Sequence, residues 1–466
     1  MTTLAFPPEF RWGTATSAYQ IEGAVDLDGR TPSIWDAFCE LPGATPNGEH
    51  GRVAIDHYHR YREDVALMAG LGLDTYRFSV SWSRVLDGDR VNPAGMDFYS
   101  RLVDELLTAG ITPWLTLYHW DLPDALPGGW TNRDTAQRFA DYALALHSRL
   151  GDRVDIWTTL NEPWCSSFLS YGGGEHAPGH TDPVEAVTAA HHLLLGHGLA
   201  TTALRQNGRS DLKLGLSLNF GPVEPATDSA ADCDVARRVD GTMNRFFVHP
   251  LFTGEYPTDV RADLDRWWPA DLVADGDLDV IAAPIDLLGV NFYSTSVMRA
   301  ARPGEAVAGP PVVRGRQLAS PHLTAPDAVT VSRGLPRTEM GWEVDPDGLR
   351  RLLTWLHREY TGPAGAGLVI TENGAAFPDR EGPDGTVDDQ DRIGYLRDHL
   401  AAVHAALEAG VDVRGYLLWS LIDNFEWAFG YAKRFGIVAV DAELRRRPKA
   451  SAAWYRSVVS TGELAV

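Results

Sequence analysis

Two glutamates in this chain follow short apolar runs that have the character of buried strands. Residues 367–374 read Gly-Leu-Val-Ile-Thr-Glu-Asn-Gly, and residues 157–164 read Trp-Thr-Thr-Leu-Asn-Glu-Pro-Trp. Such runs are typical of parallel strands buried on both faces, and parallel sheets and barrels bind ligands where their strands end. A single glutamate at a strand end often does no more than cap a nearby backbone group. Two of them, Glu162 and Glu372, predict an active site with paired carboxylates.

Paired carboxylates are the groups that hydrolysis of a glycosidic bond requires. One carboxyl protonates the departing oxygen, and the other attacks the anomeric carbon or activates a water molecule. We expect Arg77 to lie beside Glu372 and to keep it ionised as the nucleophile. Glu162, close to that negative charge and partly desolvated, is expected to have a raised pKa and to serve as the acid. Once Glu372 has become an ester, Glu162 would ionise more easily and act as the base for water.

A repeated order of helix, glycine and apolar strand predicts the elements that position these glutamates. Eight strands alternating with helices through right-handed crossovers favour a closed barrel over an open doubly wound sheet. The predicted fold class is α/β, a (β/α)8 TIM barrel with extended loops at the carboxyl ends of the strands. We expect residues 1–466 to form a single domain and the proline- and glycine-rich span 300–337 to be a long loop at the rim of the site. Helices are predicted over residues 61–69, 97–109, 134–150, 183–206, 346–359, 392–409 and 448–459, and strands over 10–16, 75–80, 112–119, 214–219, 285–293 and 413–420, besides the two that end at the glutamates.

Polar or aromatic side chains occupy seven of the eight predicted strand ends. Each alone has a structural explanation, such as an Asn that satisfies a turn, but the set predicts a sugar site in the mouth of the barrel. Tyr293 is expected to hydrogen-bond Glu372, and Trp419 to form the floor. The residues at the strand ends are Gln20, Arg77, His119, Asn161 with Glu162, Asn291 with Tyr293, Glu372 and Trp419. Those expected to hold sugar hydroxyls are Gln20, His119, Asn161 and Glu426.

Composition argues against several classes of partner. A formal net charge of −22 would be repelled by nucleic acid and by anionic membranes, and no run of eighteen apolar residues is present. Three widely spaced cysteines and the lack of a secretory signal pattern favour a cytoplasmic location. No Cys/His cluster has zinc spacing and no glycine-rich phosphate loop follows a strand, so we expect no metal and no cofactor. The oligomeric state is left open.

Four motifs in the same order resemble the signatures of family 1 glycoside hydrolases, the β-glucosidases. They are Thr159–Pro163, Ile370–Gly374, Phe10–Gly23 and Asp423–Trp427, and the resemblance extends from Phe6 to Tyr455. It implies that Glu162 is the acid/base and Glu372 the nucleophile of a retaining, exo-acting β-glucosidase that acts on small β-glucosides and cello-oligosaccharides. It implies less directly that Cys165 and Trp342 line the aglycone side of the site. The residues that match positions which bind the glycone or orient the nucleophile are Gln20, His119, Asn161, Asn291, Tyr293, Trp419, Glu426 and Trp427.

Other interpretations come from the same barrel and from other classes. A 6-phospho-β-glucosidase would need a serine and a lysine–tyrosine pair in the last loop, which Lys433 alone does not reproduce. A broad β-glycosidase that also cleaves galactosides or fucosides stays open, as does the preferred aglycone. A non-catalytic sugar-binding relative should lack one of the two glutamates, and a metal-dependent hydrolase lacks a plausible ligand set here. The sequence departs from the family pattern at residues 440–442 and 446–449. We expect these departures to affect stability or assembly and not the chemistry.

Overall fold

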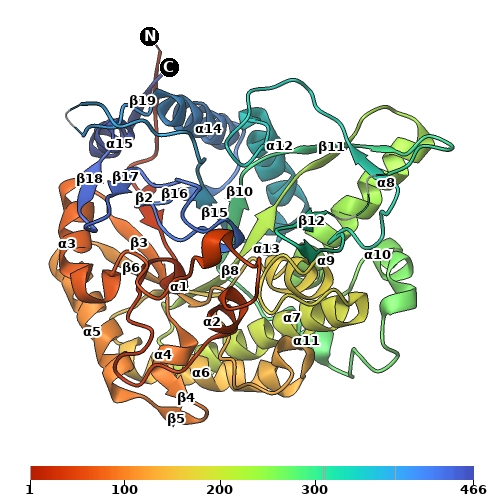
Figure 1. Cartoon of the computed structure of the whole chain (residues 1–466), viewed down its shortest axis with the longest axis horizontal. Helices are drawn as coiled ribbons and strands as arrows, with labels where there is room; N and C mark the ends of the chain where they lie inside the picture. Colours follow the sequence, from red (N-terminus) through yellow and green to blue (C-terminus); the bar gives the residue numbers. More distant parts are fainter. Residues whose placement is uncertain (1, 308, 310, 384) are drawn as a thin grey trace.

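The computed structural model, which describes residues 2–307, 309, 311–383 and 385–466, is built around a closed barrel of eight parallel strands (Figure 1). Neighbouring strands follow the order of the chain around the barrel, and the last pairs with the first. The predicted (β/α)8 barrel is therefore confirmed. That residues 1–466 form a single domain stays a prediction. The barrel strands are β2 (Arg11–Ala15), β3 (Thr75–Ser79), β6 (Thr112–Tyr118), β7 (Ile156–Asn161), β8 (Lys213–Phe220), β10 (Leu287–Phe292), β15 (Gly367–Asn373) and β16 (Val413–Trp419).

Helices surround the barrel because their apolar residues recur every three or four positions. In α6 this spacing buries Phe139, Tyr142, Leu146 and Leu150, and the helix packs against α7. Most predicted helices lie within a few residues of their predicted ends. The longer helices are α3 (His57–Gly70), α5 (Pro93–Thr108), α6 (Asp134–Leu150), α7 (Pro183–Asn207), α8 (Ala230–Asp240), α9 (Phe246–Thr253), α12 (Pro346–Leu356), α14 (Gln390–Glu408) and α15 (Ala450–Thr461). The shorter ones include α1 (Ala18–Ile21), α2 (Ile34–Cys39), α4 (Trp82–Val85), α10 (Thr258–Asp263), α11 (Asp277–Ile281) and α13 (Gly362–Ala364).

The interior of the barrel is filled by side chains and is not a channel. Trp114 of β6, Ile156 of β7, Leu287 of β10, Val369 of β15 and Leu417 of β16 form an apolar cluster of their own. Trp114 pairs in register with Arg77 of β3, so both side chains point to the inside of the barrel. The apolar cluster therefore supports a polar layer that includes Arg77.

The span 300–337, predicted as one long loop, contains regular structure. A hairpin forms between β12 (Val312–Val313) and β13 (Arg316–Gln317), and β14 (Ala328–Thr330) pairs antiparallel with β11 (Ser296–Ala300). β11 also pairs in parallel with β9 (Val223–Pro225), which follows β8. Two-residue strands are too short to show a period of two, so the sequence pattern did not reveal them.

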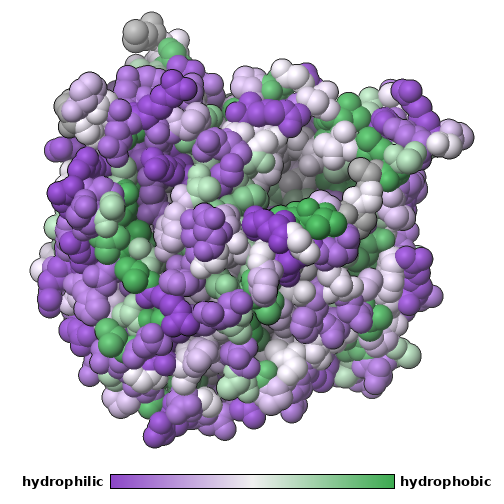
Figure 2. All heavy atoms as spheres, in the orientation of Figure 1, coloured by the Kyte–Doolittle hydropathy of each residue, from purple (hydrophilic) through white to green (hydrophobic). Residues whose placement is uncertain are grey.

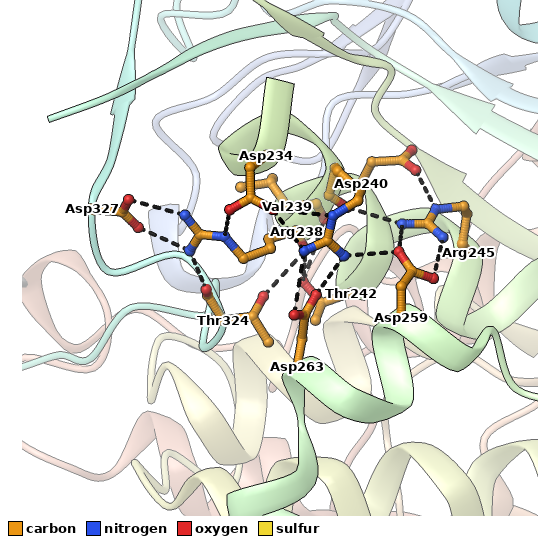
Figure 3. Close-up of polar contacts among 11 residues, drawn as sticks. Asp234, Arg238, Val239, Asp240, Thr242, Arg245, Asp259, Asp263, Thr324 and Asp327 are labelled. Atoms are coloured by element: carbon orange, nitrogen blue, oxygen red, sulfur yellow. Dashed lines mark hydrogen bonds and ion pairs between the residues drawn. The ribbon is translucent and has the colours of Figure 1, made fainter. Parts of the chain in front are cut away.

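A network of arginines and aspartates joins the segments that follow β8 and β10 (Figure 3). Arg238 of α8 binds Asp327 with both terminal nitrogens, each at 2.9 Å, which attaches the loop before β14 to α8. Arg245, in the π-helical turn Gly241–Arg245, donates to Asp259 of α10 at 2.8 Å. Asn244 of the same turn donates to the carbonyl of Gly221 at 2.9 Å. The network thereby fixes a turn that carries part of the cavity wall described below.

The two ends of the described chain lie side by side (Figure 1). β1 (Thr3–Ala5) pairs antiparallel with β19 (Glu463–Ala465), outside the barrel. The other short strands are β4 (Leu86–Asp87), β5 (Arg90–Val91), β17 (Val438–Val440) and β18 (Arg446–Pro448). Across the described ranges, no helix is both long and apolar enough to cross a membrane.

Candidate active site

A cavity of about 420 Å³ opens where the barrel strands end. Figure 2 shows a hollow in the face of the molecule near the position of β10 and β11 in Figure 1. Glu162 and Glu372 both line the cavity, so the structure brings the two predicted carboxyl groups together. The other predicted site residues that line it are His119, Cys165, Asn291, Tyr293, Trp342, Trp419, Glu426 and Trp427.

Glu372 is held by partners that stabilise a negative charge. Arg77 Nη1 donates to its Oε1 at 2.7 Å, and the Tyr293 hydroxyl donates to its Oε2 at 2.8 Å. Burial raises the pKa of Glu372 above its ordinary value, and the positive charge of Arg77 and both hydrogen bonds offset part of that rise. A β-bulge after Val290 places Glu372 opposite Asn291 of β10. Bulges next to active sites redirect a side chain in this way.

Glu162 has neutral partners and lies directly after β7. Its Oε1 accepts a hydrogen bond from Asn291 Nδ2 at 2.8 Å, and its Oε2 accepts one from the Cys165 thiol at 3.2 Å. Burial and the nearby charge of Glu372 raise the pKa of Glu162 to about 8. The Glu162 backbone has a φ of +49°, a left-handed conformation that non-glycine residues rarely adopt. The neutral partners of Glu162 favour its protonated form, whereas the guanidinium beside Glu372 favours the ionised form of that residue.

Amide groups behind the two glutamates fix their orientation. Asn161 Oδ1 accepts hydrogen bonds from Arg77 at 2.6 Å and from Asn291 at 3.0 Å. Its Nδ2 therefore faces His119 Nε2, at 3.0 Å, which must be the unprotonated ring nitrogen. Burial and the charge of Arg77 keep the pKa of His119 well below its ordinary value, so the ring is neutral.

A third carboxyl group, Glu426, lines the same cavity. Gln20 Nε2 lies 3.4 Å from Glu426 Oε2 and donates more closely to the Phe425 carbonyl, at 2.8 Å. Burial and the charges of Glu372 and Glu162 raise the pKa of Glu426 to about 8. The group is therefore mostly protonated at neutral pH in the substrate-free cavity, and it can both donate to and accept from a sugar hydroxyl.

Aromatic rings form much of the wall. The rings of His119 and Trp419 are nearly parallel, with their centroids 5.8 Å apart. The ring centroids of Trp120 and Trp427 lie 4.6 Å apart. On another part of the wall, the ring centroids of Trp342 and Tyr293 lie 5.4 Å apart. Such surfaces suit the apolar C–H faces of a sugar ring, while the carboxyl groups of Glu162, Glu372 and Glu426 suit its hydroxyls.

Three of the predicted residues are buried behind the wall. Arg77 has no exposed surface, and Gln20 and Asn161 are also buried, with their side chains bonded to residues of the site. Arg77 fulfils the contact predicted for it, whereas contact of Gln20 and Asn161 with sugar stays a prediction. Among the described residues, no group of three or more His, Cys, Asp or Glu side chains is arranged to hold a metal ion.

The sequence reasoning missed several residues of the wall. Asn219, near the end of β8, lines the cavity and follows the same strand-end rule that found the other polar residues. Thr371 was also missed; it donates to Asn291 Oδ1 at 2.7 Å. Residues that loops and short helical turns bring in gave no periodic signal, because the positions of these segments depend on tertiary contacts. These are Trp120, Trp164, Leu169, Glu175, His176, Met243, Met340, Phe429 and Phe435.

The Asn-Gly pair after Glu372 fixes the end of β15 against its neighbouring strands. Asn373 is the last residue of β15, and its Nδ2 donates to the Phe292 carbonyl at 2.7 Å. A Cβ atom on Gly374 would lie 1.6 Å from the carbonyl oxygen of Trp419. The glycine is therefore required for close approach of β15 to the end of β16.

Comparison with known proteins places this geometry among described enzymes. The model of glycosyl hydrolase family 1 matches residues 2–464. The chain is 48% identical over 472 residues to a bifunctional β-D-glucosidase/β-D-fucosidase of Bifidobacterium breve, covering 98% of this chain and 99% of that one. It is 52% identical over 463 residues to the thermostable β-glucosidase B of Thermobispora bispora, covering 98% and 91%. The crystal structure of a psychrophilic β-glucosidase from Micrococcus antarcticus has a TM-score of 0.94 at 49% identity, covering 98% of each chain.

Proposed function

The chain belongs to glycosyl hydrolase family 1 and is a glycoside hydrolase, and from this premise we propose that it is a retaining, exo-acting β-glucosidase. Its substrates would be small β-glucosides and cello-oligosaccharides, from which it removes the terminal glucosyl unit. Three β-glucosidases among its relatives support the glucosyl specificity. A pocket, in contrast to a groove across the surface, favours attack at the end of a chain. A cytoplasmic location stays a prediction.

The unequal surroundings of the two glutamates are the observation that carries this proposal. Glu372 has a guanidinium and a phenol as partners, whereas Glu162 has an amide and a thiol. Two carboxyl groups whose environments separate their pKa values are what acid and nucleophile roles require. We assign the nucleophile to Glu372 and the acid/base to Glu162.

The reaction follows in two steps from these positions. A Glu372 oxygen attacks the anomeric carbon while Glu162 gives its proton to the departing glycosidic oxygen, which leaves a glucosyl ester on Glu372. Esterification removes the negative charge of Glu372, and the pKa of Glu162 falls because that charge had raised it. Glu162 then accepts a proton from a water molecule, the water attacks the anomeric carbon, and Glu372 leaves as a carboxylate.

The stereochemistry of the first product tests the proposal. We expect p-nitrophenyl β-glucoside to yield β-glucose first, because two inversions at the anomeric carbon restore its configuration. Proton NMR of the anomeric signals during the first minutes distinguishes this product from α-glucose before the anomers equilibrate. Initial release of α-glucose would show a single displacement by water and would remove the nucleophile role from Glu372.

Glucosides phosphorylated at O6 should be poor substrates. No lysine or arginine is found among the described residues that line the cavity, and four carboxyl groups lie there, those of Glu162, Glu175, Glu372 and Glu426. Lys433, the cation in the last loop, donates to the Glu339 carbonyl at 2.7 Å. We expect kcat/KM for p-nitrophenyl β-glucoside to exceed that for its 6-phosphate by at least roughly 100-fold, because a phosphate dianion would find no cation in the lining and would be repelled by the carboxylate of Glu372.

The 6-O-methyl glucoside separates charge from size in this comparison. If charge is the cause, the methyl ether should be cleaved much faster than the phosphate. A 6-phosphate that is cleaved as well as the free glucoside would instead support the 6-phospho-β-glucosidase interpretation.

β-Fucosidase activity is the second candidate function. The relative from Bifidobacterium breve is described as acting on both β-D-glucosides and β-D-fucosides. The family resemblance of the motif Asp423–Trp427 implies that Glu426 holds O4 and O6 of the glycone. D-fucose lacks O6 and has an axial O4, so it would lose at least one of these hydrogen bonds. The Glu426→Ala substitution should therefore reduce kcat/KM for the glucoside more than for the fucoside.

A further inference from the structure

A second cavity, of about 260 Å³, adjoins the first. Glu175 and Phe429 line both cavities and so form a common wall between them. The rest of the second cavity is contributed largely by the β12–β13 hairpin, with Arg314 and Arg316 among its lining residues. The proposed reaction uses none of these groups.

The hairpin is fixed firmly to the rim of the barrel. Its two-residue turn, Arg314-Gly315, has φ values of +50° and +83°, the left-handed geometry of a tight hairpin. The Arg314 side chain donates to the carbonyls of Gly43 at 3.0 Å, Ala44 at 2.8 Å and Ala428 at 2.9 Å. A Cβ on Gly43 would lie 2.1 Å from the Arg314 carbonyl oxygen, so the two segments are in close contact. The second cavity is therefore a built feature of the rim.

The two arginines have neutral partners. In the part of the chain that the structure describes, no carboxylate oxygen lies within 4.0 Å of either guanidinium, whereas Arg238 and Arg245 in Figure 3 each bind two aspartates. Arg316 Nη2 donates to the Gly174 carbonyl at 2.8 Å, and its guanidinium lies over the Phe38 ring at 4.6 Å. Burial and the charge of Arg314 lower the pKa of Arg316. Burial raises the pKa of Glu175, the carboxyl group that lines the same cavity, so it offsets at most one of the two positive charges and the cavity is positive in a chain of net charge −22.

We propose that the second cavity binds a carboxylate at the far end of an extended aglycone, while the glucosyl unit occupies the first cavity. Guanidinium groups match the planar geometry of a carboxylate, and a bound anion would relieve the repulsion between the two arginines. The aglycone would extend from the first cavity into the second alongside Glu175 and Phe429, the residues that line both. This inference rests on the proposed function, because it assigns the first cavity to the glycone.

A series of aryl β-glucosides tests the inference. Each aglycone carries a linear chain that ends either in a carboxylate or in the primary amide of the same shape, and the length of the chain is varied. At low salt we expect kcat/KM to favour the carboxylate by about tenfold at the length that reaches Arg316, and the preference to weaken as salt screens the charges. Hydrolysis of p-nitrophenyl β-glucoside, measured in parallel, reports on the proposed function separately.

Charge variants identify the groups responsible. Arg316→Gln should abolish the preference for the carboxylate and leave the rate with p-nitrophenyl β-glucoside unchanged. Arg316→Lys should retain much of the preference, Glu175→Gln should increase it, and the exposed Arg101→Gln should not alter it. Equal kcat/KM for carboxylate and amide at every length would overturn the inference and leave a neutral extension of the aglycone site. An equal fall in kcat/KM for the carboxylate and the amide substrates in Arg316→Gln would overturn the inference too, since that result indicates a structural role for Arg316.

Discussion

Glu372→Ala should lose nearly all turnover of p-nitrophenyl β-glucoside while the protein remains folded. Without the carboxylate, no glucosyl ester can form, and we expect kcat to fall by at least about 10⁴-fold, as when a member of another catalytic unit is removed. The loss would leave Arg77 Nη1 and the Tyr293 hydroxyl, which lie 2.7 and 2.8 Å from the carboxylate oxygens, without this acceptor at the cavity wall. Sodium azide supplies an anion small enough for the vacated space, so it should restore the reaction and give α-glucosyl azide.

The matched control is Glu408→Ala, which removes an exposed glutamate from the end of α14. It should match the parent chain in turnover, and both variants should show the circular dichroism of the parent. Ordinary turnover by Glu372→Ala, or a β-configured azide product, would remove the nucleophile role from this residue.

Glu162→Ala should affect substrates according to their leaving groups. General acid catalysis contributes about 10²- to 10⁴-fold, and a poor leaving group such as the sugar of cellobiose needs all of it. Dinitrophenyl β-glucoside needs little protonation, so formation of its glucosyl ester should be nearly unaffected, and a burst of dinitrophenol should precede slow hydrolysis. Azide should here yield β-glucosyl azide, because Glu372 inverts the anomeric carbon when the ester forms and azide inverts it again when it displaces Glu372. Equal slowing of good and poor leaving groups would contradict the acid role.

The pH profile gives a second measure of the same group. The parent chain needs Glu162 protonated, so kcat/KM should fall as pH rises through about 8, the pKa to which burial and Glu372 raise this carboxyl. Glu162→Gln cannot ionise and should lose this basic limb. Glu426 titrates in the same range, so Glu426→Gln is the control that shows which carboxyl produces the limb. A basic limb that persists in Glu162→Gln would assign it to another group.

The local pattern of the sequence determined the elements and the identities of the central residues. Eight apolar runs, seven of them with polar or aromatic residues assigned to the site at their ends, predicted the barrel and the side on which chemistry would lie, because strand and helix periods are read over a few residues. Helix α6 begins and ends at the predicted residues, 134 and 150. Glu162 and Glu372 stood out for the same reason: each comes at the end of a short apolar run.

Tertiary structure alone decided how these residues are arranged. The bulge that sets Glu372 opposite Asn291 and the left-handed backbone of Glu162 depend on contacts between strands, which a local pattern does not contain. Arg77 and Glu372 are 295 positions apart, and only closure of the barrel brings their side chains to 2.7 Å. The raised pKa of Glu426 likewise arises from burial beside two other carboxyl groups. Register, burial and electrostatic coupling are long-range quantities, so the sequence specified the groups of the site and the fold specified their protonation and geometry.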